Sequence, residues 1–214
     1  MLLDYYFGSG IQKVDRYYTN RYNNRMIDNR RVILDCALQL FAVRGYDAVG
    51  VQEIVDAAGI TKPTLYHYFG SKHGLLEDVL SEHFGSLNKE VEEAARYNGD
   101  LVLTLEKTTR AFFEFSSRNP IFYRLMLSLW FAPKDSEGQK AVSIHNQHLF
   151  EVIEFLFLQA VKEHGNMRGR QMNYAATFMG MINTYIGLNL NGFIQLDDRL
   201  VYQAVHQFMH GILS

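Results

Sequence analysis

The segment from Gly45 to Leu76 constrains the fold of this chain more than any other part of its sequence. It reads GYDAVGVQEIVDAAGITKPTLYHYFGSKHGLL, so two short stretches with helical spacing of apolar residues are separated by a turn at Gly59. Two short helices joined by such a turn form a helix-turn-helix, which presents its second helix to the major groove of DNA. We therefore expect a helix-turn-helix over about residues 50–69.

Helical spacing predicts which side chains of this motif face inward and which face outward. The inward positions are Val51, Ile54, Val55, Ala58, Leu65 and Phe69. Thr61 is a suitable N-cap for the second helix, and Pro63 fits its first turn. Ser71 can cap the following helix, where an N-terminus beside Lys72 would favour a phosphate. The candidate DNA contacts are Thr61, Lys62, Thr64, Tyr66, His67, Lys72 and, through a phosphate, Gln52.

The overall composition supports an all-α fold and a local DNA-binding surface. The chain has 214 residues, of which 48% are hydrophobic and only three are proline, and its net charge is −2. DNA affinity must therefore come from a local basic patch and not from the charge of the whole molecule. Apolar periodicity predicts further helices at about 28–44, 71–97, 101–117, 120–131, 139–164, 168–190 and 198–213.

Residues 1–27 differ from the rest of the chain. They contain five tyrosines and four basic residues without helical periodicity, and Met26 directly precedes the first convincing helix. One interpretation is that Met26 is the native start. The other is a basic, aromatic arm that reaches DNA outside the major groove. Both remain open at this stage.

The motif AAGITKPTLYHYFGSKHGLL resembles the recognition-helix signature of the TetR family of transcriptional regulators, and GYDAVGVQEI resembles the segment before it. The resemblance is specific over about residues 29–76. It implies an N-terminal extension (1–27), a helix-turn-helix DNA-binding domain (28–76) and a helical effector-binding and dimerisation domain (77–214). It also implies a homodimer on a double-stranded DNA operator and an apolar or amphipathic small-molecule effector. The chain departs from the family pattern at Val49 and Gly50, which lack phosphate-binding hydroxyls, and at His73-Gly74, which lacks an acidic residue.

The C-terminal half is rich in aromatic residues and methionine. Most of these residues are expected in the core, but pockets between helices are lined by such side chains with a few polar groups. The candidate effector pocket consists of Phe112, Phe115, Tyr123, Met126, Trp130, His148, Phe155, Asn173, Met179 and Asn183.

Two stripes in the last helices predict a dimer surface. Small residues recur along one helix, and apolar residues along the next, which would permit an isologous four-helix contact. The candidate residues are Ala176, Gly180, Gly187, Val201, Val205, Phe208 and Ile212. Such a dimer would place its recognition helices about 34 Å apart, one turn of DNA.

Other classes of protein receive little support. The sequence contains no nucleophile–base–orienter set, no phosphate-loop glycine pattern and no cofactor signature, so an enzyme is not expected. The pairs His145/His148 and His206/His210 have zinc-compatible spacing but lack further ligands, so no metal is expected. Cys36 is expected as core filler. A single cysteine permits no intramolecular disulfide, so we expect a cytoplasmic location. No apolar stretch approaches the ~20 residues that cross a membrane, so we expect a soluble protein.

The sequence therefore predicts a DNA-binding transcription regulator, namely a homodimeric repressor that a small molecule releases from its operator. A helical ligand-binding protein with weakened DNA binding and a transcriptional activator are the alternatives.

Overall fold

In the computed structural model, which describes residues 29–211, the chain is built from helices, and no strand occurs in that range. The helices are α3 (Asn29–Arg44), α4 (Val51–Ala58), α5 (Lys62–Phe69), α6 (Lys72–Ala94), α7 (Leu101–Arg118), α8 (Pro120–Trp130), α9 (Glu137–Ala160), α10 (Gln171–Leu190) and α11 (Asp198–His210). A 3-10 turn at Gly165–Met167 precedes α10. The all-α prediction is confirmed. The extension 1–27 and Ile212 lie outside the described residues.

Helices α3, α4 and α5 form a small N-terminal unit that contains the expected helix-turn-helix. Gly59 ends α4 with φ 65°, a left-handed conformation that glycine adopts without strain. Thr61 caps α5, its side chain accepting from the backbone N–H of Thr64. The buried side chains of Phe41, Ile54 and Leu65, one from each helix, meet in the core of this unit.

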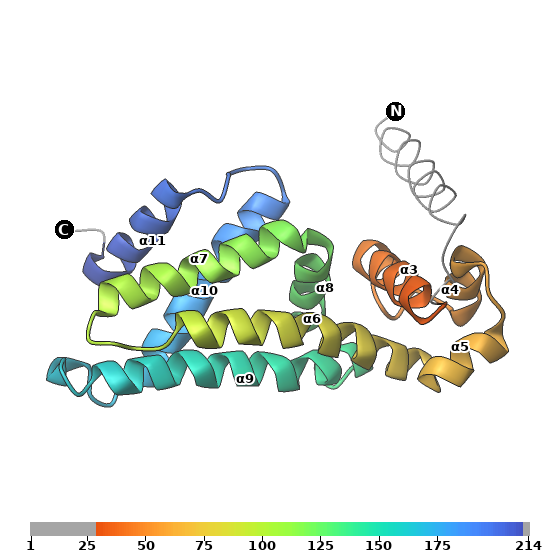
Figure 1. The fold of residues 1–214 in the computed structure, drawn as a ribbon, viewed down its shortest axis with the longest axis horizontal. Coiled ribbons are helices and arrows are strands. Elements are labelled where there is room, and N and C mark those ends of the chain that lie inside the picture. The colour runs from red at the N-terminus through yellow and green to blue at the C-terminus, as the bar shows by residue number, and fades with distance from the viewer. Residues whose placement is uncertain (1–28, 212–214) are drawn as a thin grey trace.

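Helix α6 is shared by both parts of the molecule. It begins beside α5, with the Ser71 hydroxyl accepting from Gly74 N, and packs against α3 at this end. Its later turns pack between α7 and α9, as Figure 1 shows. The helix ends at Ala94, slightly before the position near residue 97 that periodicity predicts.

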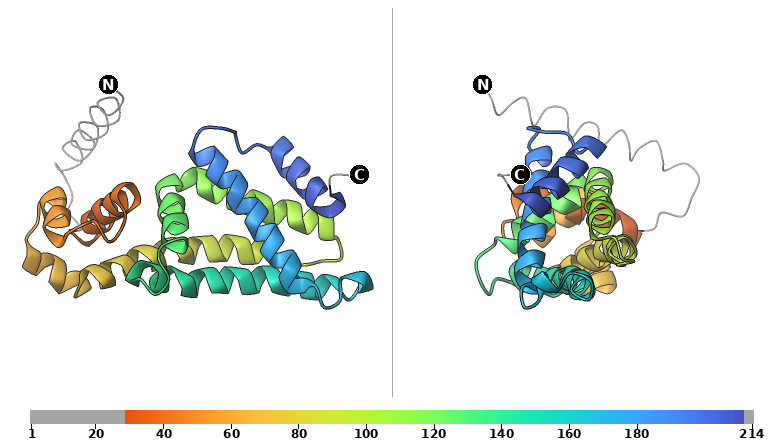
Figure 2. Two further views of the ribbon diagram at one scale, coloured as in Figure 1. Left: turned by 180° about the vertical axis from the view of Figure 1, so that it is seen from behind. Right: turned by 90° about the vertical axis from the view of Figure 1, so that its left-hand side faces the viewer.

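The C-terminal half consists of the later turns of α6 together with α7, α9, α10 and α11, which form a bundle, and the short α8. Helix α10 packs on α9, and α11 packs on α7. The short α8 stands between this bundle and α3, against which it packs directly (Figure 1). Seen from behind, α10 crosses the bundle diagonally, with α8 to one side and α9 below (Figure 2). This arrangement leaves α8, α9 and α10 around one open space, which is described below.

Aromatic side chains fill the bundle core. Phe84, Phe115 and Phe122 are fully buried and meet edge to face, with ring centroids 5.3 Å and 6.1 Å apart. Phe157 and Phe178 make a similar contact between α9 and α10 at 6.1 Å. Edge-to-face pairs of this kind add to the stabilisation from burial, which fixes the helices around α6.

Candidate DNA interface and effector cavity

Helix α5 has one buried side and one exposed side. Leu65 and Phe69 are 0% and 8% exposed and hold the helix against α4 and α6. Lys62, Tyr66 and His67 lie on the exposed side, together on one short helix. A lysine, a phenol and an imidazole on an exposed helix supply a cation and hydrogen-bond donors suited to phosphates and base edges.

The two threonines predicted to contact DNA bond to each other. Their hydroxyl oxygens lie 2.9 Å apart, and Thr61 Oγ1 also accepts from Thr64 N at 3.4 Å. These contacts fix the start of α5 and leave remaining hydroxyl capacity for a phosphate. On α4, Gln52 Nε2 donates to Asp56 at 2.7 Å, so this amide is already occupied and would have to rotate to reach DNA.

Gly50 precedes α4 without a side chain, and Glu53 compensates. Glu53 Oε1 accepts from Gly50 N at 3.1 Å, and its other oxygen pairs with Arg44. The carboxylate therefore satisfies an orphan donor at the helix start that a hydroxyl cap would not reach. Val49 is 1% exposed and Gly50 has no side chain, so neither position offers a hydroxyl to a phosphate.

Lys72 has an internal role that its sequence position did not predict. Its Nζ donates to the carbonyl oxygens of Tyr46 and Val49, both at 3.1 Å, and lies 4.2 Å from the centre of the Tyr46 ring. An ammonium has three donors. Two of them brace the loop between α3 and α4, so at most one is available to DNA.

Tyr46 joins this loop to the C-terminal half. The residue is 3% exposed, its ring packs edge to face on Phe41 at 5.1 Å, and its hydroxyl donates to Glu137 Oε2 at 2.8 Å. Burial, followed by the hydrogen bond to Glu137, raises the pKa of the Tyr46 hydroxyl above its usual range. The raised pKa favours the neutral phenol, which is the form that donates to Glu137.

A cavity of about 950 Å³ opens between α8, α9 and α10. It is lined by Arg124, Met126, Leu127, Ser128, Trp130, Phe131, Asn146, Gln147, Phe150, Ala176, Met179, Gly180, Asn183, Thr184, Gly187, Leu190 and Asn191. The volume is at the upper end of the ~300–1,000 Å³ typical of ligand sites. The walls combine apolar side chains with neutral amides and hydroxyls.

The structure divides the residues predicted for the pocket into two groups. Met126, Trp130, Met179 and Asn183 line the cavity. Phe112 and Phe115 are buried in the core, while Asn173 is exposed on α10, and none of the three lines it. Tyr123 is also buried, but its hydroxyl donates to Asn183 Oδ1 at 2.7 Å and so orients one lining side chain.

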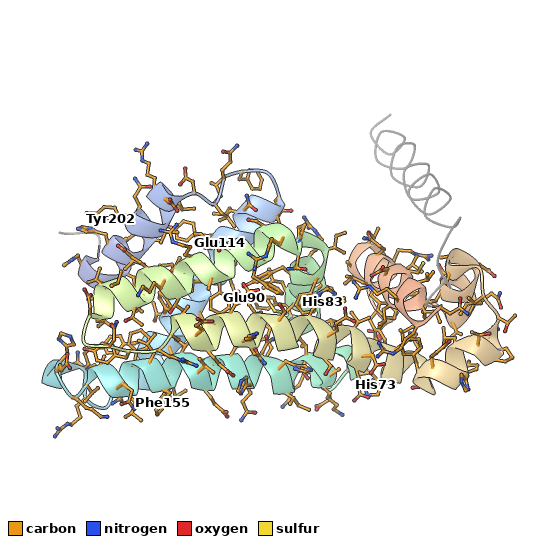
Figure 3. All side chains as sticks on the ribbon, in the orientation of Figure 1. His73, His83, Glu90, Glu114, Phe155 and Tyr202 are labelled. Carbon is orange, nitrogen blue, oxygen red and sulfur yellow. The ribbon has the colours of Figure 1, made fainter. Side chains whose placement is uncertain are left out.

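Two further predicted pocket residues lie on the outside of the molecule. His148 Nε2 is 2.8 Å from Glu92 across the surface between α9 and α6. Phe155 is 60% exposed and projects from the outer side of α9 (Figure 3). Sequence reasoning missed Arg124, Asn146, Gln147 and Phe150, whose positions on α8 and α9 fall on the cavity side only once the two helices are packed.

The predicted dimer stripes separate in the same way. Ala176, Gly180 and Gly187 lie on the cavity side of α10 and line its opening. Val201 and Val205 are 3% and 0% exposed within this chain, and Phe208 packs on Phe178 at 5.3 Å. The stripe on α11 therefore faces the chain's own core because α7 and α10 cover it. The exposed side of α11 carries Tyr202, His206 and His210 instead (Tyr202 is labelled in Figure 3).

The two histidine pairs noted in the sequence differ in their surroundings. His145 stacks on Phe84 at 4.5 Å, while His148 pairs with Glu92 at the surface. His206 and His210 lie with ring centroids 4.6 Å apart. Within residues 29–211, no group of three or more His, Cys, Asp or Glu side chains is arranged to hold a metal ion. Cys36 is buried, and burial raises the pKa of its thiol to about 11.

The helices of the described range are also too short or too polar to cross a membrane. Their arrangement, a helix-turn-helix unit packed against a helical bundle that contains a cavity, can be compared with known proteins.

Residues 33–79 match the family model of bacterial regulatory proteins of the tetR family. The transcriptional activator FasR of Mycolicibacterium smegmatis is 40% identical over 109 residues, which cover 50% of each chain. The transcriptional repressor KstR2 of Rhodococcus jostii is 36% identical over 85 residues, or 40% of this chain and 42% of that protein. The chain thus spans about half, or less, of the length of these relatives.

The fold extends the likeness over most of the chain. The transcriptional regulator FadR of Bacillus subtilis, solved in complex with stearoyl-CoA, superposes with a TM-score of 0.72 at 17% identity, covering 85% of this chain and 98% of that one. At this identity the likeness concerns the fold alone. The chain thus carries the N-terminal domain of the TetR family of bacterial regulatory proteins, joined to an all-helical C-terminal half.

Proposed function

We propose that this chain is a DNA-binding transcription regulator that binds a pseudo-palindromic operator as a homodimer. It acts in the cytoplasm as a repressor, and a small amphipathic molecule in the α8–α9–α10 cavity releases it. One observation carries the proposal: α8 packs against α3 of the helix-turn-helix unit on one side and lines the cavity on the other. The same helix therefore touches both the DNA-binding part and the effector site.

The DNA contacts are assigned to the exposed side of α5. Lys62, Tyr66 and His67 read the major groove, while Thr61 and Thr64 contact the backbone near the start of the helix. Lys72 contributes at most one N–H to a phosphate, since Tyr46 and Val49 hold the others. Gln52 contacts a phosphate only after leaving Asp56.

The effector is assigned to the class of molecules with a long apolar part and a polar head. The cavity offers Met126, Phe150 and Met179 to an apolar chain and several amides to a head group. The stearoyl-CoA complex of FadR, which has the same fold, supports an acyl-CoA as the first candidate. Binding shifts the repressor to a geometry with low operator affinity because the ligand differs in affinity for the two states.

The dimer is assigned to the exposed side of α10, with the exposed side of α11 beside it. Gly180 and Thr184 are exposed there, and Gly180 has open space where a side chain would stand. Small residues let a second helix approach closely. A second copy packed on this side of α10 would also cover the open side of the cavity.

Two alternatives remain distinct from this proposal. FasR, which is 40% identical over half of the chain, is named an activator, which supports activation as the second candidate. A ligand-binding protein with weakened DNA affinity would fit the missing hydroxyls at positions 49 and 50 and the internal role of Lys72.

The decisive experiment measures binding to DNA from the region upstream of the protein's own gene by fluorescence anisotropy at several salt concentrations. The proposal predicts salt-dependent binding with at least ten-fold preference over scrambled DNA and release by stearoyl-CoA. Lys62→Ala should weaken binding, while Lys107→Ala, which removes an exposed lysine from α7, should not. Equal affinity for scrambled DNA would contradict the proposal. In vitro transcription on the same DNA then separates repression from activation.

A further inference from the structure

Arg124 on α8 lines two neighbouring cavities. It lines the 950 Å³ cavity together with Met126 and Leu127. It also lines a second cavity of about 300 Å³, whose other walls include Ala42 and Val43 at the end of α3. Arg124 is thus the residue at which the proposed effector site meets the helix-turn-helix unit.

Among the described residues, the hydrogen-bond partner of the Arg124 guanidinium is a neutral carbonyl. The guanidinium donates to the carbonyl oxygen of Leu190, in the last turn of α10, and it forms no ion pair with any carboxylate of the described residues. Among those ion pairs, Arg44, Arg110 and Arg118 each bind a carboxylate. No carboxylate of residues 29–211 therefore pairs with Arg124 at the edge of the cavity.

No other charged residue lines the cavity within the described range. The remaining walls are apolar or carry neutral amides and hydroxyls, among them Asn183, which Tyr123 holds in place. A guanidinium presents a fork of donors that matches the oxygens of a carboxylate or phosphate. It binds these anions more strongly than it binds a neutral carbonyl oxygen. An anionic amphiphile matches this lining, because its apolar part would contact the apolar side chains and its negative head group would pair with Arg124.

We propose that Arg124 binds the carboxylate or phosphate of the effector and gives up the Leu190 carbonyl to do so. The inference rests on the proposed function and deepens it by naming the head-group chemistry and the residue that senses it. Leu190 lines the smaller cavity together with Ala42 and Val43. Exchange of the Leu190 carbonyl for an anion therefore changes the contact between α8 and α10 directly beside α3.

The chain provides its own reporter for a test. Trp130 is its single tryptophan and lines the cavity, so intrinsic fluorescence follows occupancy without a label. We would titrate the full chain with stearoyl-CoA, stearate and octadecanol, each below the concentration at which it aggregates. The three ligands share one alkyl chain and differ in the head group, so the first two distinguish a phosphate-bearing from a carboxylate head.

Arg124→Gln removes the charge, and Arg124→Lys keeps it without the fork. Arg110→Gln is the matched control, since it removes an exposed arginine on α7 that pairs with Asp198 away from the cavity. We expect the wild type to bind at least one anionic ligand about ten-fold or more tightly than octadecanol. Arg124→Gln should lose about 10- to 100-fold for that ligand alone, and Arg124→Lys should be intermediate.

Three results would overturn the inference: equal affinity of the wild type for all three ligands, an equal loss for all three in Arg124→Gln, or no binding of either anionic ligand. The titration needs no DNA, so failure to bind an operator would contradict the proposed function and leave this result standing. The signalling step has its own readout. Saturating octadecanol should leave the operator bound while the anionic ligand releases it, and equal release by both would show that Arg124 does not carry the signal.

Discussion

The Tyr46 hydroxyl donates a 2.8 Å hydrogen bond to Glu137 Oε2, joining the loop after α3 to the first turn of α9 across 91 residues of sequence. Lys72 Nζ lies over the same ring, 4.2 Å from its centre, and donates to the Tyr46 carbonyl. The phenol is therefore held between the start of α6 and the start of α9. Both helices extend into the C-terminal bundle, so this junction and α8 form two separate routes between the ends of the molecule.

Tyr46→Phe should lower the free energy of unfolding by about 0.5–1.5 kcal/mol, because it removes one hydrogen bond and keeps the ring contacts. Chemical denaturation measures this change. Glu137→Gln retains an acceptor oxygen and is the control, with an expected loss below that of Tyr46→Phe. If Tyr46→Phe left the free energy of unfolding unchanged, the hydrogen bond between Tyr46 and Glu137 would make no net contribution to stability.

Lys72 and Lys62 should separate stability from DNA binding. Lys72→Ala leaves the carbonyls of Tyr46 and Val49 without their donor, so we expect a loss of about 1–3 kcal/mol in the free energy of unfolding. Lys62→Ala should stay within about 0.5 kcal/mol of the wild type. It should instead weaken operator binding. The slope of the logarithm of the binding constant against the logarithm of the salt concentration should become shallower by about one. If Lys72→Ala left stability intact and weakened only DNA binding, its main role would be at the phosphate.

Acidification should destabilise the protein through His83 and His145. Each ring stacks on a phenylalanine at 4.5 Å, His83 on Phe122 and His145 on Phe84, and burial lowers the pKa of both below 6.5. Above that pH both states are neutral, and no stability depends on these groups. As the pH falls below 6.5, the unfolded chain takes up protons first, so the free energy of unfolding decreases.

Denaturation at a series of pH values from 8 to 5 measures this effect. His145→Gln should flatten the pH dependence below 6.5, because it removes one of the two buried histidines with a lowered pKa. An identical slope in wild type and His145→Gln would assign the acid sensitivity to other groups.

The dimer surface can be tested at Gly180. A side chain added there meets open space, so Gly180→Arg should preserve the fold of the chain while blocking a second copy on α10. Gly85 on α6 is likewise helical, exposed and open, which makes Gly85→Arg the matched control. Size-exclusion chromatography with light scattering should give a dimer for the control and a monomer for Gly180→Arg. A dimer in both variants would place the interface elsewhere.

The bounds of α4 and α5 could be predicted because the residues that determine them are neighbours in the sequence. Glycines, a threonine cap and apolar spacing define α4 and α5, and the structure places their ends at the expected residues. The side chains of Leu65 and Phe69 are buried as their spacing indicates.

What the sequence did not predict depends on which helices become neighbours. The spacing of Val201 and Val205 indicates an apolar face, but only the packing of α11 on α7 shows that this face is covered within one chain. Phe115 and Met126 have similar character in sequence, yet one lies in the core and the other lines the cavity. The internal bonds of Lys72 arise from a loop 23 residues earlier, beyond the reach of any local pattern.

Helix α8 has 11 residues, with proline only at its first position and no glycine, so its sequence contains none of the usual causes of a kink, and we expect it to move as one unit. Because α3 packs against α8, we expect a shift of α8 at the cavity wall to move α3 as well. Release from the operator would then depend on where the bound ligand places α8, and not simply on whether the cavity is occupied. A molecule that fills the cavity and leaves α8 in place would then act as a silent competitor, protecting the operator-bound state from the natural signal.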